Sequence, residues 1–347
     1  MVFQVLPASR VPDPALAPAL KWGILAPGFI AHAFAGALRA HTRQQVVAVG
    51  SRTAERAQAF AAEFGVPKAH ASYRALVEDP EVEAVYVASP HSEHAALALL
   101  AIEAGKHVLV EKAFTRNAKE ARQVVAAAQK RGVALMEAMW SRFLPRYDIV
   151  RQLLADGVLG DLETVVADHG QRLDRDRTPR LHDPALAGGA LLDLGIYPVS
   201  FACFALGVPA GLLAAGSHTD TGVDRQVSAL LTRFTGNPNA QAVVNCTLAA
   251  RTPTTATISG TLGRIELDGP FYVPGTVRLV LPDGTSLSSA PPEISGHQGL
   301  AYEAAHFAQL VADGFTESPQ LPLDETVAIL GVLDEIRTQV KVRYPGE

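Results

Sequence analysis

Short runs of Val, Ile and Leu alternate with alanine-rich stretches of helical length from residue 21 to about residue 137. This alternation is typical of repeated βα units, which build a parallel sheet with helices on both faces. We therefore predict an α/β fold whose first domain, residues 21–138, is a doubly wound Rossmann sheet. The runs predict strands at 22–25, 46–51, 84–88, 107–110 and 133–136, with helices such as 53–64 and 117–130 between them.

The pattern changes after Trp140, where β-forming segments follow one another without helices between them. Adjacent antiparallel strands explain this order best. Residues 139–347 are therefore predicted to form a second, α+β domain with a largely antiparallel open sheet. The predicted strands include 162–167, 227–234 and 240–247, and helical stretches at 302–312 and 324–340 close the chain.

Residues 1–20 contain four prolines among alanines and are predicted to form an extended arm. They lack the basic-then-apolar order of a secretory signal. Two arrangements fit this composition. One is a disordered tail, and the other is a strap that lies on its own domain or on a partner subunit.

Composition argues against several classes of function. A formal net charge of −5 gives no basic surplus for a phosphate backbone, so nucleic acid is not expected as a partner. No uninterrupted apolar run reaches the roughly 18 residues of a membrane span, so no membrane role is expected. Cys203 and Cys246 lie in apolar or β-forming runs, which favours free buried thiols and a cytoplasmic location. No Cys or His pair has zinc-ligand spacing, so no metal is predicted.

The first predicted strand runs into a glycine-containing turn that opens a helix. In the dinucleotide-binding pattern G-x-G-x-x-G/A, the first position is Ala26, the second is Gly28, and Phe29 and Ile30 follow it. The free amides and the dipole of such a helix start favour a pyrophosphate. The alternative is that Gly28 only permits a tight turn between strand and helix.

The end of the second predicted strand bears on the choice of cofactor. NAD enzymes carry Asp or Glu there for the ribose hydroxyls, whereas this chain carries Ser51 and Arg52. A hydroxyl beside a guanidinium suits a 2′-phosphate, and Arg56 follows one helical turn later. We therefore expect NADP, with NAD possible. The alternative is that Arg52 is only a solvated residue at a helix start.

The strand predicted at 107–110 ends in an adjacent acid and base, Glu111 and Lys112, at the sheet edge where open α/β folds bind ligands. Taken alone, charged residues at a strand end are usually only solvated, so position by itself does not favour a catalytic role. Together with Asn117, however, this segment resembles the strand and E-K-P-x-x-x-N signature of the Gfo/Idh/MocA oxidoreductases. Ala113 replaces the proline of that signature.

A second motif supports the same resemblance. Residues 188–197 are similar to the G-G-G-x-L-x-D-x-G-x-[HY] helix start of that family, in the form that ends in Tyr197. The Tyr form resembles the branch with dimeric dihydrodiol dehydrogenases and glucose-fructose oxidoreductase more than the inositol dehydrogenases. The resemblance covers residues 21–340.

The resemblance implies a reaction and residues to perform it. It implies NADP-dependent hydride transfer between nicotinamide and a small sugar, polyol, dihydrodiol or carbonyl substrate, with Tyr197 as the acid/base. The Lys112 ammonium would favour the phenolate of Tyr197 and stabilise charge on the reacting oxygen. Asp193, four residues before Tyr197 on one helix face, would orient the pair or a sugar hydroxyl. The second domain would bind substrate and form a homodimer or homotetramer.

The resemblance also marks further contacts, and each has a structural alternative. The aromatic residues fit a core, the arginines fit a surface, and the histidines fit a helix start. The implied cofactor contacts are Ser89, Pro90, His91, His94, Glu111, Lys112, Trp140 and Arg142, and the implied substrate contacts are Phe143, Arg180 and Tyr197.

Two other functions remain open. A non-catalytic NADP-binding sensor would share the fold, although Lys112 and Tyr197 together favour an enzyme. In the second alternative, NADP stays bound and is recycled between two sugars.

Overall fold

The computed structural model describes residues 5–347, so the first four residues of the predicted arm lie outside the described part. The chain forms two compact units, and neither is a continuous stretch of sequence. The parallel-sheet unit contains residues 11–143 and 294–327. The antiparallel-sheet unit contains residues 5–10, 144–293 and 328–347 of the described part.

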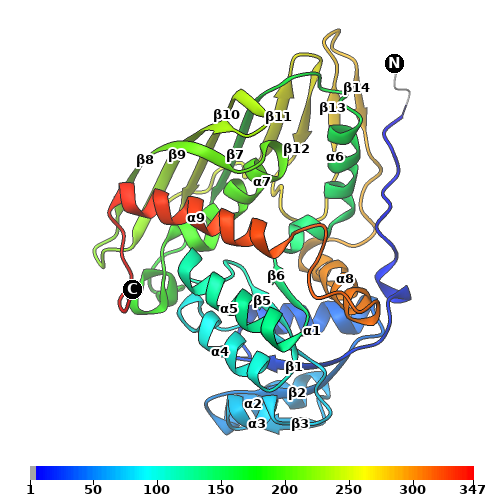
Figure 1. The fold of residues 1–347 in the computed structure, drawn as a ribbon, viewed down its shortest axis with the longest axis vertical. Coiled ribbons are helices and arrows are strands. Elements are labelled where there is room, and N and C mark those ends of the chain that lie inside the picture. Colours follow the sequence, from blue (N-terminus) through cyan, green and yellow to red (C-terminus); the bar gives the residue numbers. More distant parts are fainter. Residues whose placement is uncertain (1–4) are drawn as a thin grey trace. The chain divides into compact units, whose positions relative to one another are not determined.

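The parallel-sheet unit is built on six strands that pair in parallel in the order β3-β2-β1-β4-β5-β6 (Figure 1). The chain passes β1 (Lys21–Leu25), α1 (Phe29–His41), β2 (Gln45–Gly50), α2 (Ala54–Phe64), β3 (Lys68–His70), α3 (Tyr73–Val77), β4 (Ala84–Val87), α4 (His91–Glu103), β5 (His107–Glu111), α5 (Ala118–Arg131) and β6 (Leu135–Ala138). The predicted doubly wound sheet is confirmed. The central strand β4 and the edge strand β6 are buried along their whole length because helices cover both faces of the sheet.

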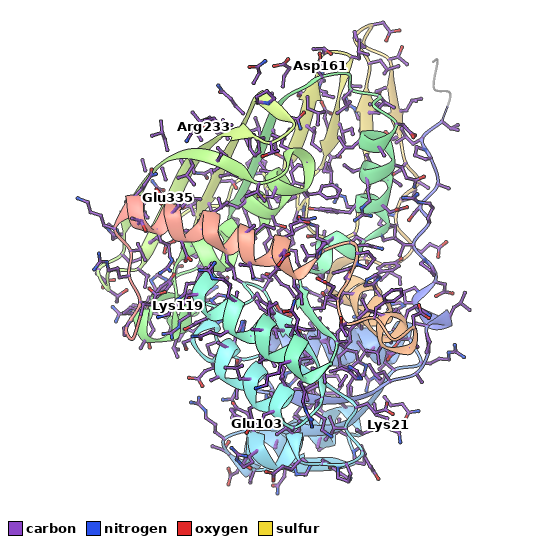
Figure 2. The ribbon with its side chains drawn as sticks, in the orientation of Figure 1. Lys21, Glu103, Lys119, Asp161, Arg233 and Glu335 are labelled. Carbon is purple, nitrogen blue, oxygen red and sulfur yellow. The ribbon has the colours of Figure 1, made fainter. Side chains whose placement is uncertain are left out.

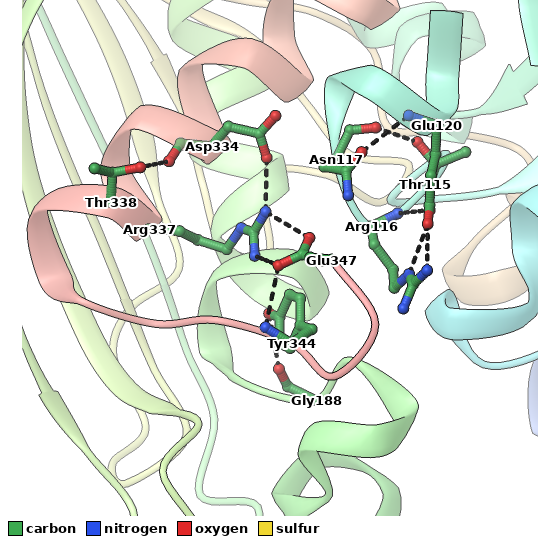
Figure 3. Close-up of polar contacts among 10 residues, drawn as sticks. All are labelled: Thr115, Arg116, Asn117, Glu120, Gly188, Asp334, Arg337, Thr338, Tyr344 and Glu347. Carbon is green, nitrogen blue, oxygen red and sulfur yellow. Dashed lines mark hydrogen bonds and ion pairs between the residues drawn. The ribbon is translucent and has the colours of Figure 1, made fainter. Parts of the chain in front are cut away.

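The start of α5 shows how the sequence fixes a helix boundary. The Asn117 side chain accepts a hydrogen bond from the Glu120 amide at 2.9 Å, which is the geometry of an N-cap (Figure 3). In return, the Glu120 carboxylate accepts hydrogen bonds from the Arg116 amide at 3.2 Å and from its guanidinium Nε at 2.8 Å. These hydrogen bonds fix the first turn of α5, which directly follows the segment that contains Lys112.

A late segment of the chain completes this unit. Helix α8 (Leu300–Ala312) packs on α1, and its Phe307 lies 5.5 Å from the ring of Trp22, which also contacts Phe34 at 5.5 Å. These rings are buried and fill one side of the core. The predicted boundary assigned residues 139–347 to one domain. The structure instead places 294–327 with the first unit because the apolar face of α8 is buried there.

The antiparallel-sheet unit contains an eight-stranded sheet in the order β14-β13-β12-β11-β7-β10-β9-β8. Only the β7–β10 pair is parallel, so the predicted, largely antiparallel sheet is confirmed. Its strands are β7 (Leu162–Gly170), β8 (Pro209–His218), β9 (Asp224–Phe234), β10 (Asn237–Thr247), β11 (Ala256–Gly260), β12 (Gly263–Leu267), β13 (Arg278–Val280) and β14 (Ser286–Ser288). Its helices include α6 (Pro145–Ala155), α7 (Ile196–Leu206) and most of α9 (Leu323–Val340).

The two faces of this sheet differ. Buried and exposed residues alternate along β9 and β10, and α7 packs on the buried face against β7 and β10. On the other face, the strand register lines up four aliphatic residues across β8, β9, β10 and β7. We call Leu213, Leu230, Val243 and Val166 the aliphatic row. Leu213 is 70% exposed, Val243 46% and Val166 49%, so the row faces outward.

The charged side chains labelled in Figure 2, such as Glu103, Lys119 and Arg233, are all exposed. Among the described residues, Pro184–Leu206 is the one segment that is long and apolar enough to cross a membrane. Its most apolar window is 94% buried, as in the core helix of a folded domain. The sequence prediction of no such span had considered only uninterrupted apolar runs, whereas this segment contains Asp193.

The described part of the N-terminal arm lies on its own chain. The Arg10 guanidinium donates to the Asp148 carboxylate of α6 at 2.8 Å, and Gln152 donates to the Ala8 carbonyl at 2.9 Å. Further along, the short turn Pro14–Leu16 packs on α8. Of the two arrangements left open by the sequence, these contacts match the strap.

Candidate functional site

The turn between β1 and α1 has room for a phosphate group. Ala26 adopts φ of 65°, in the left-handed region that favours glycine, and its amide donates to the Gly50 carbonyl at 3.0 Å. Gly28 is the N-cap of α1, and no side chain caps this helix start. A Cβ atom placed on Gly28 would meet only the Ala26 carbonyl oxygen, at 3.9 Å. The first amides of α1, from Phe29 and Ile30 onward, therefore lie beside an open space that suits a pyrophosphate.

The end of β2 presents a hydroxyl and two guanidinium groups. Ser51 is buried, and its amide donates to the His70 carbonyl at 3.1 Å. Arg52 and Arg56 are exposed, and neither forms an ion pair within residues 5–347. Burial raises the pKa of Tyr73, the first residue of α3, and the charge of Arg52 opposes this shift. The donor set fits a 2′-phosphate because both cations are available to an anionic ligand.

His94 joins two loops at the carboxyl edge of the sheet. Its Nδ1 lies 2.9 Å from the Ala113 carbonyl and its Nε2 lies 2.8 Å from the Ser89 carbonyl. Burial lowers the pKa of His94 to about 4, so the ring is neutral at pH 7 and can donate to only one of these carbonyls. His91, one turn earlier, is also buried, with its ring 5.5 Å from that of His94. His94 thus positions the loop that begins at Ser89 and Pro90, and its ring nitrogens face the backbone.

Lys112 follows β5 and is half-buried. The carboxylate of the preceding Glu111 accepts hydrogen bonds from the phenol of Tyr86 and, at 3.2 Å, from the Lys112 amide. The peptide bond between Lys112 and Ala113 is cis. Burial and the Lys112 charge both lower the pKa of His297, so this histidine lies near the ammonium group.

His297 belongs to a short turn, Gly296–Gly299, that precedes α8. Its ring stacks on Trp140, with centroids 5.8 Å apart and planes 7° from parallel, and it contacts Phe29 edge to face at 5.5 Å. Lys112, Trp140, Phe29 and His297 therefore form one cluster next to the β1–α1 turn. The sequence analysis did not identify His297, since no local motif surrounds it.

Arg142 and Phe143 are placed differently from Trp140. Both are buried, and Arg142 forms an ion pair with Glu325 at 2.5 Å. The Phe143 ring lies 4.7 Å from that of His306, which in turn contacts Ser318. These side chains are engaged in core contacts, so cofactor contact by Arg142 and substrate contact by Phe143 stay predictions.

The buried carboxyl groups of Glu111, Glu137 and Glu303 lie close enough for their charges to affect one another. Glu137 accepts hydrogen bonds from the Phe114 amide and the Thr326 hydroxyl, both at 3.1 Å, and burial raises its pKa to about 7. Glu303 of α8 is fully buried, and neither carboxylate oxygen has a hydrogen-bond partner among the described residues. Burial and the charges of Glu111 and Glu137 raise the pKa of Glu303 well above its usual range. The surroundings of Glu303 therefore favour its protonated, neutral form.

In the antiparallel-sheet unit, Tyr197 and Asp193 flank the start of α7. Residues Leu191–Gly195 form a single π-helical turn, and α7 begins at Ile196. The sequence predicted one continuous α-helix, but the chain widens here, as is common at functional sites. Asp193 forms an ion pair with the half-exposed Arg180 at 3.2 Å. The structure thus brings together Tyr197, Asp193 and Arg180 on one segment and its neighbouring loop.

An aromatic group surrounds the Tyr197 ring, which is only 6% exposed. Tyr272 stacks on Tyr197 with centroids 4.2 Å apart, and His169 of β7 lies 5.5 Å from Tyr197 and 4.6 Å from Tyr272. The Gln171 amide donates to His169 Nε2 at 2.9 Å and approaches the Tyr272 hydroxyl at 3.5 Å. Burial and the charge of Asp193 raise the pKa of Tyr272 to about 12. Tyr272 is therefore a protonated hydrogen-bonding group at neutral pH.

Both halves of this arrangement match one family. Residues 20–139 match the Gfo/Idh/MocA oxidoreductase family with its NAD-binding Rossmann fold, and residues 147–266 match the C-terminal domain of the same family. The chain belongs to the Gfo/Idh/MocA oxidoreductase family. This confirms the resemblance based on residues 107–117 and 188–197, and with it the predicted class of nicotinamide-dependent oxidoreductase.

Several relatives of this Gfo/Idh/MocA protein are known over nearly its full length. The trans-1,2-dihydrobenzene-1,2-diol dehydrogenases of Macaca fuscata fuscata and Homo sapiens are 39% and 38% identical, and each match covers 95% of this chain and 99% of the relative. A solved 3-ketoreductase from Actinomadura kijaniata, in complex with NADP and TDP-benzene, is 29% identical with a TM-score of 0.82. An aldose-aldose oxidoreductase from Caulobacter crescentus, complexed with glycerol, is 26% identical with a TM-score of 0.82. Both structural matches cover 93% of this chain and 98% of the other.

The residues that sequence analysis missed come from distant segments. His169 and Tyr272 reach Tyr197 only through the pairing of the second sheet and the loop after β12, and His297 reaches Trp140 through the late segment before α8. None of them stands in a recognisable motif. The one sequence feature that could have indicated a site is that Tyr272 is an aromatic residue in a loop rich in glycine and proline.

The raised pKa of Glu303 gives a pH-dependent prediction. Its folded-state pKa lies above its unfolded value, so its stabilising effect is full at low pH and declines as the pH rises. A proton retained only in the folded state costs up to about 1.4 kcal/mol of unfolding free energy per pH unit. We expect Glu303→Gln to reduce the fall in thermal midpoint between pH 5 and pH 8, measured by circular dichroism. Glu103→Gln, at an exposed position of α4, is the control, and an identical fall in parent and Glu303→Gln would contradict the prediction.

Proposed function

We propose that this protein is an NADP-dependent oxidoreductase that transfers a hydride between nicotinamide and a small sugar, polyol, dihydrodiol or carbonyl substrate. Tyr197 acts as the acid/base, and Lys112 assists it. The observation that carries the proposal is the enclosure of Tyr197 by Tyr272 and His169, since a reactive phenol needs a fixed orientation and few competing waters. The protein acts in the cytoplasm, where its buried thiols Cys203 and Cys246 remain reduced.

Cofactor binding is supported by the β1–α1 turn and by the end of β2. The uncapped start of α1 would hold the pyrophosphate, and Ser51, Arg52 and Arg56 would hold the 2′-phosphate. Ser89 and Pro90 would contact the cofactor through the loop that His94 positions. The 3-ketoreductase from Actinomadura kijaniata, which is bound to NADP, supports the same choice of cofactor.

The bound nicotinamide would supply or accept the hydride. In the reduction direction, Tyr197 donates a proton to the carbonyl oxygen, and in oxidation it takes the hydroxyl proton. Positive charge from Lys112 favours the phenolate and stabilises negative charge on the same oxygen. Tyr272, whose pKa is about 12, keeps its proton and helps to orient the Tyr197 ring.

The substrate class follows from the groups around Tyr197. The Asp193–Arg180 pair offers a charged acceptor and donor for vicinal hydroxyls, and the stacked Tyr272 offers an aromatic face to a ring. Dihydrodiols combine both features, as the names of the dehydrogenases from Macaca fuscata fuscata and Homo sapiens also suggest. Small sugars share the hydroxyl pattern.

The open face of the antiparallel sheet is proposed as the surface for self-association into a dimer, and a tetramer could form from two such dimers. The aliphatic row crosses four neighbouring strands, and a two-fold axis through it would bury the row against its own copy. Rows of this kind are uncommon on a monomer because they leave aliphatic area in water.

The proton-transfer role is tested by Tyr197→Phe, which keeps the ring but removes the hydroxyl. We expect kcat for oxidation of trans-1,2-dihydrobenzene-1,2-diol, or of the best substrate in a panel of aldoses and dicarbonyls, to fall by at least about a hundredfold. NADPH affinity, measured by fluorescence titration, should stay the same. Tyr147→Phe removes a hydroxyl from another buried tyrosine and should retain activity.

A double-variant cycle tests whether Lys112 and Tyr197 act together. Groups that act as one unit are strongly non-additive, so Lys112→Met combined with Tyr197→Phe should lose little more than Tyr197→Phe alone. Full activity of Tyr197→Phe would show that the proton-transfer role is wrong.

The choice of NADP is tested by Arg52→Ala and Arg56→Ala. Loss of a charge-assisted hydrogen bond should weaken NADPH binding by about tenfold to a hundredfold in each variant, with NADH binding unchanged. Titration by isothermal calorimetry measures both. Arg74→Ala serves as the control, because it removes an exposed arginine of α3 that forms an ion pair with Glu78. Equal weakening of NADPH and NADH binding would contradict a 2′-phosphate contact.

The association surface is tested by Leu213→Glu combined with Val243→Glu. Charges across the aliphatic row should convert the dimer to a monomer in sedimentation-velocity experiments, because each would be buried without a partner. Leu262→Glu, at an exposed aliphatic outside the row, should leave the dimer intact. A double variant that still sediments as a dimer would place the interface elsewhere.

A further inference from the structure

The segment that carries Asp193 and Tyr197 begins at a tightly enclosed turn, Gly188–Gly189. A Cβ atom on Gly188 would lie 2.5 Å from the Leu181 carbonyl oxygen. Gly189 has φ of 114°, and a Cβ there would clash with the Asp224 carboxylate. The turn thus fits between the loop at Leu181 and the first residue of β9, and any displacement must move one of these neighbours.

Asp224 holds the helix start from outside the helix. It is 1% exposed, and its Oδ2 accepts a hydrogen bond from the Leu191 amide at 2.5 Å. The Ala190 amide also stabilises the carboxylate. Its Oδ1 faces Gly189 and has no hydrogen-bond partner among the described residues. A carboxylate at this place satisfies amides that the helix itself leaves unpaired.

Tyr344 holds the same turn from the other end of the chain. Its side chain is buried, and its hydroxyl donates to the Gly188 carbonyl at 3.0 Å (Figure 3). The Tyr344 amide donates to the Glu347 carboxylate at 3.1 Å. That carboxylate also accepts two hydrogen bonds from Arg337 of α9, at 2.8 and 2.9 Å.

Arg337 completes the support of the Tyr344 ring. Its guanidinium carbon lies 4.7 Å from the ring centroid, and its Nη2 also donates to Asp334 at 2.8 Å. The guanidinium is therefore fixed by two carboxylates, and it fixes the ring in turn. The phenol that reaches Gly188 has little freedom to move.

We propose that Asp224 and Tyr344 are positioning residues that set the orientation of the Leu191–Gly195 turn and thereby of Asp193 and Tyr197. The inference rests on the proposed function, because it gives these two residues a role in catalysis through the residues that they orient. Neither Asp224 nor Tyr344 is assigned a contact with substrate or cofactor. Their two hydrogen bonds end on consecutive parts of the turn, the Gly188 carbonyl and the Leu191 amide.

Burial of the Asp224 carboxylate costs more free energy than an apolar side chain would at the same position. Desolvation raises the pKa of Asp224 to about 6, and the hydrogen bond from Leu191 only partly offsets the shift. An apolar side chain at the same position would avoid that cost but could not accept the Leu191 hydrogen bond. The Asp224 carboxylate therefore fixes the orientation of the helix start through its hydrogen bond from the Leu191 amide.

Tyr344→Phe is the deciding experiment, because it removes one hydroxyl and keeps the ring on Arg337. We expect kcat on the best substrate of the panel to fall about tenfold, with NADPH affinity and the Michaelis constant for NADP unchanged. Hydrogen–deuterium exchange of the segment 188–197, followed by mass spectrometry, should become faster. Thr338→Val, which removes a hydroxyl bonded to the Asp334 carbonyl on the same helix, should change neither measurement.

A second pair of variants separates geometry from bulk stability. Asp224→Asn keeps an oxygen for the Leu191 amide and should retain most of the activity, whereas Asp224→Ala should lose as much as Tyr344→Phe. If Asp224→Ala does not fold, Tyr344→Phe and Asp224→Asn still decide the question.

The outcomes also distinguish this inference from the proposed function. Parental kcat and exchange in Tyr344→Phe, together with an inactive Tyr197→Phe, would overturn the positioning role and leave the proposed function intact. Full activity in Tyr197→Phe would overturn the proposed function. In that case, the exchange measurement alone tests whether Tyr344 positions the turn. Unchanged hydrogen–deuterium exchange over 188–197 in Tyr344→Phe would overturn that role, and faster exchange would support it.

Discussion

The first amides of a helix have no partner inside the helix, and the candidate site of this protein is organised by how those amides are satisfied. At α5 the Asn117 side chain caps the helix directly. At the π-helical turn before α7 the cap comes from Asp224, a residue of a neighbouring strand. At α1 no side chain caps the helix, and the space beside Gly28 is open. The same requirement is therefore met in three ways. The start of α5 is capped by its own segment, the turn before α7 is capped by a neighbouring strand, and the start of α1 is available to an anion.

Burial sets the charge state of the groups around these helix starts. His94 is neutral at pH 7 because burial lowers its pKa to about 4, although its hydrogen bonds to the Ser89 and Ala113 carbonyls oppose that shift. Burial, together with the charges of Glu111 and Glu137, raises the pKa of Glu303 and so favours its neutral form. Near Lys112, these neutral groups leave the ammonium as a prominent positive charge. In the other unit, Tyr272 keeps its proton for the same reason of desolvation. These groups can therefore form hydrogen bonds without adding a charge that would compete with the Lys112 ammonium.

Local patterns predicted the parts of the structure that local forces determine. Five of the six parallel strands could be predicted because each is a short, largely buried apolar run. The edge strand β3 was missed because Lys68–His70 is short and polar. Ser51 and Arg52 could be predicted because a strand end places them at the sheet edge. The position of α8 could not be predicted, since its apolar face could pack on either unit. Only the structure shows that Phe307 of α8 packs against Trp22, which also contacts Phe34. His297 and Tyr272 lie near the site only through long-range packing, which leaves no mark on neighbouring residues. The π-helical turn was missed because its sequence also satisfies an α-helical pattern.

The division of the chain into two discontinuous units limits how this protein can be cut or recombined. The chain passes from one unit to the other after residues 10, 143, 293 and 327, so each unit is assembled from separate stretches. A fragment that ends near residue 138 would contain every parallel strand and yet expose the rings that Phe307 covers. Exchange of whole domains between members of the family would therefore need several junctions at once, whereas substitution within loops needs none. Diversity of substrate in such an architecture is more accessible through loop residues than through the transfer of intact domains.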